Sequence, residues 1–189
     1  MEPPDQVAAV ILAAGEARRF GSPKQLALLN GRTLLQHVVD AALQAGLAPI
    51  ITIVPPGIAL PGVDVTRIEN PEPERGMSHS LRLGFANLPA EVNAALVLLG
   101  DQPMVGSRLI GRLLAARGAT PFVATLSEGA RVPPVLVERS HFGVVEQASG
   151  DVGLRDILRR HAELVTAVDE PRMAADVDTV DDLHAIGGG

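Results

Sequence analysis

Two uninterrupted apolar segments constrain the fold of this chain more than any other feature. VAAVILA at residues 7–13 and AALVLLG at residues 94–100 contain no polar side chain, and a glycine turn follows or closes each. A strand with one solvated face alternates polar and apolar residues, whereas a strand covered by helices on both faces is apolar throughout. We therefore expect two central strands of a buried, mostly parallel sheet.

The rest of the chain alternates between helical and extended patterns. TLLQHVVDAALQAG at 33–46 has apolar residues at helical spacing, a threonine at its start and a glycine at its end. The sequence predicts further helices at 77–88, 107–117, 140–147, 153–161 and from Thr179, and strands at 49–54, 63–68, 121–126, 133–138 and 164–168, with 121–126 and 133–138 paired. This order predicts a single α/β domain over 1–189, a Rossmann-like sheet with helices on both faces. Residues 1–6 and 187–189 are expected to be flexible tails.

The composition excludes several classes of protein. Hydrophobic residues make up 47% of the 189 residues but aromatic ones only 2%, so the core must consist of Leu, Val, Ile and Ala. The chain has no cysteine, which excludes disulfides and thiolate metal sites and fits a reducing compartment. A net charge of −6 without a basic block argues against a nucleic-acid partner, and the first apolar run is too short to span a membrane. We expect a cytoplasmic protein.

The loop after the first run, LAAGEARRFGSPKQLALL at 12–29, holds the only lysine of the chain. Ala13, Ala14 and Gly15 have almost no side chain, so backbone N–H groups can approach a phosphate or a base. The loop is neither a Walker A motif nor a dinucleotide fingerprint, because it lacks Gly-Lys-Ser/Thr and two of three glycines. Solvated loop charges are the alternative. Lysine offers a compact point charge that arginine does not, so we predict a phosphate contact for Lys24.

Asp101 directly follows the second apolar run. In open α/β sheets ligands bind at the carboxyl ends of the strands, where Asp101 and the 12–29 loop should meet. A carboxylate beside such a strand is costly unless it is solvated or bound to a cation. Because Mg²⁺ takes one or two carboxylates plus substrate phosphates, Asp101 is a candidate magnesium ligand. The alternative is an Asx turn with Gln102-Pro103.

Five motifs resemble one enzyme family. LAAGEARRFGSPKQL, NPEPERGMSHSLRLGF, LVLLGDQPMV, SGDVGLRDIL and DVDTVDDL are similar to segments of molybdenum cofactor cytidylyltransferase and related nucleotidyltransferases. The resemblance implies the nucleotide-diphospho-sugar transferase type of fold. It also implies Mg²⁺-dependent transfer of CMP from CTP to the phosphate of molybdopterin, with release of pyrophosphate. A molybdenum enzyme that receives the product is an implied partner.

The resemblance also assigns roles to residues. Lys24, Arg19 and Asp101 are implied to be catalytic, with Asp101 and Asp178 as metal ligands and Asp176 a weaker candidate. Asp151 and Gly153 are implied to lie on the acceptor side. The implied nucleotide site comprises Leu12, Ala13, Ala14, Gly15, Arg19, Lys24, Asn70, Gly76, Met77 and Ser80.

Several of these roles have structural alternatives. Asp178 and Thr179 begin the last predicted helix, where Thr179 and Asp182 are spaced like a capping box. Asn70 precedes a proline and can form a turn, and Ser80 can cap a helix. Asp151 can be a helix N-cap.

The predicted chemistry needs no general base, because the acceptor phosphate is already an anion at neutral pH. Positioning and electrostatics then carry catalysis, and no Ser-His-Asp pattern or histidine ligand spacing is present. The chain departs from its relatives at Pro73, where they carry an aromatic residue, and at 132–134, where they carry Gly-His-Pro. These departures concern the acceptor. A sugar or polyol phosphate acceptor and a non-catalytic accessory protein for a molybdenum enzyme remain alternatives.

Overall fold

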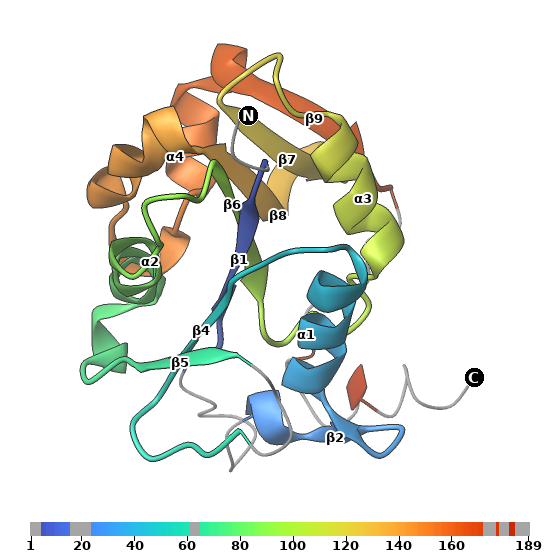
Figure 1. The fold of residues 1–189 in the computed structure, drawn as a ribbon, viewed down its shortest axis with the longest axis vertical. Helices are drawn as coiled ribbons and strands as arrows, with labels where there is room; N and C mark the ends of the chain where they lie inside the picture. The colour runs from blue at the N-terminus through green and yellow to red at the C-terminus, as the bar shows by residue number, and fades with distance from the viewer. Residues whose placement is uncertain (1–4, 16–23, 61–64, 172–176, 178–181, 184–189) are drawn as a thin grey trace.

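The computed structural model describes residues 5–15, 24–60, 65–171, 177 and 182–183. Within these residues seven strands form one sheet in the order β5-β4-β1-β6-β8-β7-β9 (Figure 1). Among them only β8 runs antiparallel to its neighbours, so the mostly parallel sheet predicted from the sequence is confirmed. The strands are β1 (Val7–Leu12), β4 (Ile50–Val54), β5 (Thr66–Glu69), β6 (Ala94–Leu99), β7 (Phe122–Ser127), β8 (Ala130–Glu138) and β9 (Val165–Asp169).

Helices cover both faces of the sheet, as Figure 1 shows. Alternate residues of β1 face opposite layers because side chains alternate along a strand. Ile11 belongs to the core formed with α1 and α3, whereas Val10 packs in the core formed with α2 and α4. This explains why the 7–13 segment is apolar at every position. The helices are α1 (Leu34–Gln44), α2 (Met77–Ala86), α3 (Ser107–Ala115) and α4 (Arg155–Arg160).

Local sequence signals set the ends of several elements as predicted. Thr33 caps α1: its Oγ1 accepts the Gln36 N–H at 3.1 Å, while the Gln36 side chain accepts the Thr33 N–H at 2.8 Å. The predicted pairing of 121–126 with 133–138 appears as the antiparallel β7–β8 pair. The core consists mainly of Leu, Val, Ile and Ala, joined by Phe85 and Phe122.

The structure differs from the predicted elements in two places. The segment expected as a helix near 140–147 is a 3₁₀ helix, η3 (Arg139–Gln147). A hairpin of β2 (Leu28–Leu29) and β3 (Arg32–Thr33) was not predicted, although its turn is Asn30-Gly31, both with positive φ, as a two-residue hairpin requires. The helix predicted from Thr179 is observed at residues 182–183, and its start lies outside the described residues.

The strand order changes direction beside β1. The chain runs from β1 outward to β4 and β5, then returns through α2 to β6 on the other side of β1. Ligand sites in open α/β sheets form at such a switch point, at the carboxyl ends of the strands. The remaining short 3₁₀ helices are η1 (Lys24–Leu26), η2 (Pro73–Arg75), η4 (Gly150–Val152) and η5 (Ala162–Leu164). Among the described helices, none has the length and apolar character needed to cross a membrane.

Candidate active site

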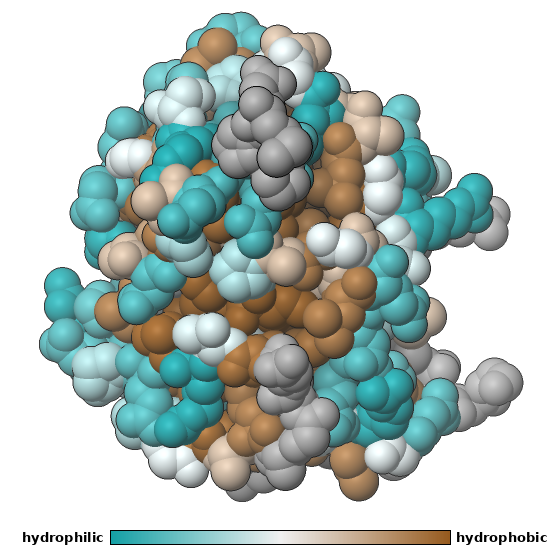
Figure 2. Space-filling view, in the orientation of Figure 1, coloured by the Kyte–Doolittle hydropathy of each residue, from teal (hydrophilic) through white to brown (hydrophobic). Residues whose placement is uncertain are grey.

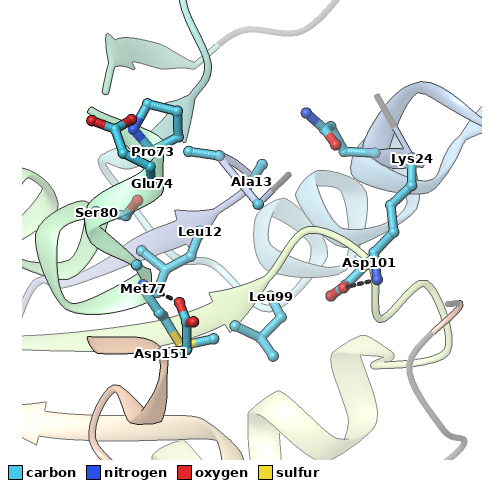
Figure 3. Close-up of a pocket in the computed structure, with 14 residues that line it drawn as sticks. Leu12, Ala13, Lys24, Pro73, Glu74, Met77, Ser80, Leu99, Asp101 and Asp151 are labelled. Atoms are coloured by element: carbon cyan, nitrogen blue, oxygen red, sulfur yellow. Dashed lines mark hydrogen bonds and ion pairs between the residues drawn. The ribbon is translucent and has the colours of Figure 1, made fainter. Parts of the chain in front are cut away.

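A cavity of about 500 Å³ opens where β1 and β6 end. Figure 2 shows apolar side chains gathered at the middle of the face that is turned toward the viewer, in the region where Figure 1 shows β1 and β6. Leu12 and Leu99 lie between two polar walls, with Lys24 and Asp101 on one side and Glu74 and Ser80 on the other (Figure 3). The described residues that line the cavity are Leu12, Ala13, Ala14, Gly15, Lys24, Gln25, Pro73, Glu74, Gly76, Met77, Ser80, Leu99, Asp101 and Asp151.

The charged wall is an ion pair between the only lysine and the aspartate after β6. Lys24 Nζ lies 2.7 Å from Asp101 Oδ2, and the two side chains are only 18% and 22% exposed. Partial burial lowers the local dielectric and strengthens this contact relative to a surface pair. The carboxylate that follows a fully apolar strand is thus compensated by a cation from a distant segment.

Backbone hydrogen bonds on either side of Ala27 connect Lys24 to the base of the β2–β3 hairpin and to α1. Lys24 begins η1, and its carbonyl accepts the Ala27 N–H at 2.9 Å. The Ala27 carbonyl in turn accepts the Leu34 N–H at 2.9 Å, which ties η1 to the start of α1. The lysine is therefore anchored by backbone hydrogen bonds on its C-terminal side.

The opposite wall is the N-terminal end of α2. Ser80 is buried and lines the cavity, and its Oγ accepts the Asn70 Nδ2–H at 2.9 Å. Asn70 is fully buried, and its Oδ1 accepts the Glu72 N–H at 2.9 Å. Asn70 is not among the described lining residues. Its amide instead orients Ser80 and closes the turn before η2. The Ser80 O–H can still donate to a ligand.

The 150–153 segment packs directly on the start of α2. Asp151 Oδ1 accepts the Met77 N–H at 3.2 Å, shown as a dashed line in Figure 3. Gly76 has φ +83°, and a Cβ there would lie 2.6 Å from Asp151 Oδ1 and 2.7 Å from the Gly150 carbonyl carbon. A Cβ on Gly153 would lie 2.8 Å from Met77 Sδ. Only glycine at these two positions lets the 150–153 segment lie this close to α2. The close packing places the Asp151 carboxylate in the wall of the cavity.

The structure brings together most of the residues predicted from the sequence. Ten of them line one cavity: Leu12, Ala13, Ala14, Gly15, Lys24, Gly76, Met77, Ser80, Asp101 and Asp151. Gly153 lines a neighbouring cavity instead. Arg19 and Asp178, like Arg18 and Asp176, lie outside the described residues.

The cavity is also lined by Gln25, Glu74 and Leu99, which were not predicted from the sequence, and by Pro73, which was noted there only as a departure from related sequences. Gln25 is 3% exposed, and its Nε2 has no hydrogen-bond partner among the described residues. A buried amide without a partner is unfavourable, so this group is suited to a ligand. Its position next to Lys24 was the one available signal.

The donor set fits a divalent cation that arrives with a nucleotide. Asp101 provides one carboxylate at the cavity, and Mg²⁺ commonly takes one or two carboxylates and completes its octahedron with phosphates and water. Among the described residues, no group of three or more His, Cys, Asp and Glu could hold an ion by itself. One carboxylate at an open cavity fits a cation that phosphate oxygens and water also coordinate.

The family of the chain follows from a comparison with protein-family models. Residues 9–176, which include the carboxyl ends of β1 and β6, match the MobA-like NTP transferase domain. The chain belongs to this family. Its membership confirms the resemblance seen in the motifs and the predicted nucleotidyltransferase type of fold.

Individual relatives show how far the likeness extends. GlmU of Bordetella parapertussis, a bifunctional protein, is 35% identical over 154 residues, and the match covers 76% of this chain but 32% of that protein. The chain thus spans about a third of the length of GlmU. Nicotine blue oxidoreductase of Paenarthrobacter nicotinovorans is 29% identical over 201 residues, which cover 95% of this chain and 96% of that protein.

Among solved structures, Rv0371c of Mycobacterium tuberculosis H37Rv resembles this chain over nearly its whole length. The TM-score is 0.80 at 30% identity, covering 97% of this chain and 98% of that one. A complex of Rv0371C with manganese matches with a TM-score of 0.76 at 28% identity and the same coverage.

Proposed function

We propose that this protein transfers a nucleotidyl group from a nucleoside triphosphate to a phosphate on a small-molecule acceptor, with release of pyrophosphate. CTP is the proposed donor and molybdopterin the proposed acceptor, because the motifs resemble those of molybdenum cofactor cytidylyltransferase. The observation that carries the proposal is the 2.7 Å Lys24–Asp101 pair, which joins η1 to the residues that follow β6. It puts a cation and a potential metal ligand on one wall of a cavity large enough for a nucleotide.

The cavity suits a reaction whose main barrier is charge. An oxygen of the acceptor phosphate attacks the α-phosphorus, and the bond from the α-phosphorus to the bridging oxygen breaks as pyrophosphate leaves. The attacking oxygen is already anionic, so no side chain has to remove a proton. Lys24 offsets the negative charge that develops around the α-phosphate.

Asp101 is the proposed metal ligand, and Asp178 the proposed second ligand. Val177, the residue before Asp178, donates its N–H to the Asp101 carbonyl at 3.2 Å, which supports this assignment. A divalent cation, Mg²⁺ in this proposal, supplies charge neutralisation and alignment of the phosphates when bound. The manganese complex of Rv0371C supports a divalent cation in this family. Arg19 is proposed to hold the β- and γ-phosphates.

Base recognition is proposed to combine the small residues after β1 with the α2 wall. Ala13 and Ala14 are nearly buried and present little side chain, so a flat base can lie against the backbone. Ser80 offers an O–H fixed in place by Asn70. Asp151 and Met77 close the far side, which is the proposed direction of the acceptor.

The proposal is tested by pyrophosphate release from each of the four NTPs, with and without molybdopterin. We expect release that requires both CTP and molybdopterin. A parallel series with glucose 1-phosphate and glycerol 3-phosphate identifies transfer to a sugar or polyol phosphate instead. No release with any donor and acceptor would contradict the transferase proposal. The activity has to be measured directly, because a relative that matches nearly the whole chain is named an oxidoreductase. Related folds can host different reactions.

A further inference from the structure

A second cavity, of about 90 Å³, adjoins the nucleotide cavity. The two share Leu12, Met77, Leu99 and Asp151 as a common wall. The inner surface of the second cavity is apolar, with side chains from β6, β8, α2 and α4 such as Val97, Val135, Leu81 and Leu158. The space is smaller than one that encloses a benzene ring, about 150 Å³, so it accepts a small apolar group or the edge of a ring.

One charged residue in this cavity lacks the partners that such a group normally has. Arg131 of β8 lines the cavity, and its buried Nε has no hydrogen-bond partner within the part of the chain that the structure describes. Among the described residues its guanidinium makes one long hydrogen bond, 3.5 Å from Nη2 to the Ala162 carbonyl. By contrast, Arg117 uses Nε and Nη2 on Glu138 at 2.9 and 3.0 Å and Nη1 on Asp5 at 2.6 Å.

A partly buried guanidinium without a carboxylate is unfavourable unless something else accepts its hydrogen bonds. Arg131 has five N–H donors in a planar fork, a shape that matches carboxylate and carbonyl oxygens. Its place on an apolar cavity next to the reaction site makes a ligand oxygen the fitting acceptor. Arg155, which is exposed and lines the same cavity, adds positive charge at this end.

Asp151 stands between the two positive regions. Its carboxylate is held by the Met77 N–H at the wall that both cavities share. Lys24 lies on the nucleotide side and Arg131 lines only the second cavity. A ligand that crosses this wall passes from Lys24 over the apolar Leu12 and Leu99, beside the Asp151 carboxylate, to Arg131.

We propose that the second cavity receives the far end of the acceptor's organic part, which enters as the edge of a ring or another small apolar group that carries an anionic or carbonyl oxygen. The proposal rests on the proposed transferase function and names the class of its acceptor. The acceptor phosphate lies toward Lys24, the apolar body passes Leu12 and Leu99, and the far oxygen accepts from Arg131. A polyol chain fits poorly, because each hydroxyl buried here without a partner weakens binding by about tenfold or more.

Binding of defined probes to the full chain, without any nucleotide, tests this proposal. The probes are 4-carboxybenzylphosphonate, benzylphosphonate and glycerol 3-phosphate, each titrated by calorimetry. We expect 4-carboxybenzylphosphonate to bind at least about tenfold more tightly than glycerol 3-phosphate. Equal affinity of these two would overturn the apolar class of acceptor.

Variants locate the far oxygen. Arg131→Leu should weaken 4-carboxybenzylphosphonate by about tenfold and leave benzylphosphonate unchanged, since only the former carries the carboxylate. The matched control is Arg159→Leu, which removes an exposed arginine of α4 that pairs with Asp156 outside the cavity. Val152→Ser changes an apolar lining residue that is 42% exposed, and should weaken both benzyl probes without affecting the thermal midpoint. Equal losses for the two benzyl probes in Arg131→Leu would overturn the Arg131 contact.

These measurements separate this inference from the proposed function. If the probes bind as expected and no NTP yields pyrophosphate, the cavity assignment stands and the transferase proposal fails. If pyrophosphate is released with an acceptor whose KM is unchanged in Arg131→Leu, the transferase proposal stands and the cavity assignment fails.

Discussion

Lys24 Nζ lies 2.7 Å from Asp101 Oδ2 and joins the segment after β1 to the end of β6. Both side chains are mostly buried, and both line the cavity in which nucleotidyl transfer is proposed. The pair gives the Asp101 carboxylate a counter-ion before any substrate binds. It also places the lysine within reach of any phosphate that shares a cation with Asp101. The first predictions concern these two residues.

Lys24→Arg should lower kcat nearly as much as Lys24→Ala, on the order of 10²-fold, comparable to the loss of one transition-state donor. The planar guanidinium is wider than an ammonium and cannot take the same position beside Asp101. The affinity for CTP should change much less than kcat, because the contact strengthens as charge develops. Steady-state kinetics of both variants with CTP provide the measurement. A normal kcat for Lys24→Arg would show that the identity of this cation is unimportant.

Asp101→Asn should lower activity by about 10²-fold or more at limiting Mg²⁺. The substitution keeps the size and shape of the side chain, but it replaces one accepting oxygen with an N–H donor and removes the negative charge that a cation requires. The fold should persist, which a thermal melt checks. A wild-type rate at limiting Mg²⁺ would identify Asp101 as a turn residue and favour the accessory-protein alternative.

Gly76→Ala should destabilise the protein by about 3 kcal/mol and raise the KM for CTP. The new Cβ would need φ near +83° and would lie 2.6 Å from Asp151 Oδ1, so the 150–153 segment must move away from α2. Gly57→Ala is the matched control, because Gly57 has φ +75° and none of the described residues lies within 4 Å of its Cβ position. Chemical denaturation of the control should show only backbone strain, about 1 kcal/mol. Equal losses in the two variants would mean that the Gly76–Asp151 approach is unimportant.

The sequence could predict those parts of the fold that depend on local patterns. The apolar runs of β1 and β6 and the capping box of α1 each carry a signal within a few residues. The nine residues of η3 do not, since periods of 3.0 and 3.6 residues are hardly distinguishable over so short a segment. The β2–β3 hairpin carried a usable signal in Asn30-Gly31 that the apolar pattern around it concealed.

The site was predictable to the extent that its chemistry depends on residue type. Lys24 was distinctive as the only lysine, and Asp101 as a charge after an apolar strand. Contacts between distant segments left no such trace. The Asp151–Met77 hydrogen bond joins residues 74 positions apart, and nothing in the sequence separates Arg131 from the other arginines. Such contacts are set by tertiary packing.

CTP should be used in preference to GTP by at least about tenfold in kcat/KM, a ratio that a few pocket contacts can supply. Ser80→Ala should reduce this ratio to near one, because it removes the one O–H that Asn70 holds at the cavity. Ser78→Ala is the control, since Ser78 is equally buried in α2 but is not among the described lining residues. Competition between the two nucleotides in one assay measures the ratio. Equal use of both by the wild-type protein would remove the cytidylyl assignment and leave the transferase class.

Lys24→Met should increase the affinity of the nucleotide-free protein for Mn²⁺ by about tenfold. In the wild-type protein the ammonium is 2.7 Å from Asp101 Oδ2, so an incoming divalent cation must share the carboxylate with it or displace it. Two unit cations 4 Å apart repel by about 4 kcal/mol at an effective dielectric constant of 20, and rotation of the lysine relieves most of this. A net gain of tenfold corresponds to about 1.4 kcal/mol. Electron paramagnetic resonance of free Mn²⁺ measures the affinity without any turnover.

Two further variants determine whether the gain in Mn²⁺ affinity comes from this pair. Lys24→Met combined with Asp101→Asn should lose the gain, because the carboxylate that would bind the ion is absent. Arg32→Met, which removes an exposed cation that pairs with Asp40 away from the cavity, should leave the affinity unchanged. CTP should restore tight Mn²⁺ binding to the wild-type protein, since its phosphates bind both the ion and the displaced ammonium. Identical Mn²⁺ affinities of wild type and Lys24→Met would show that the lysine does not compete for Asp101.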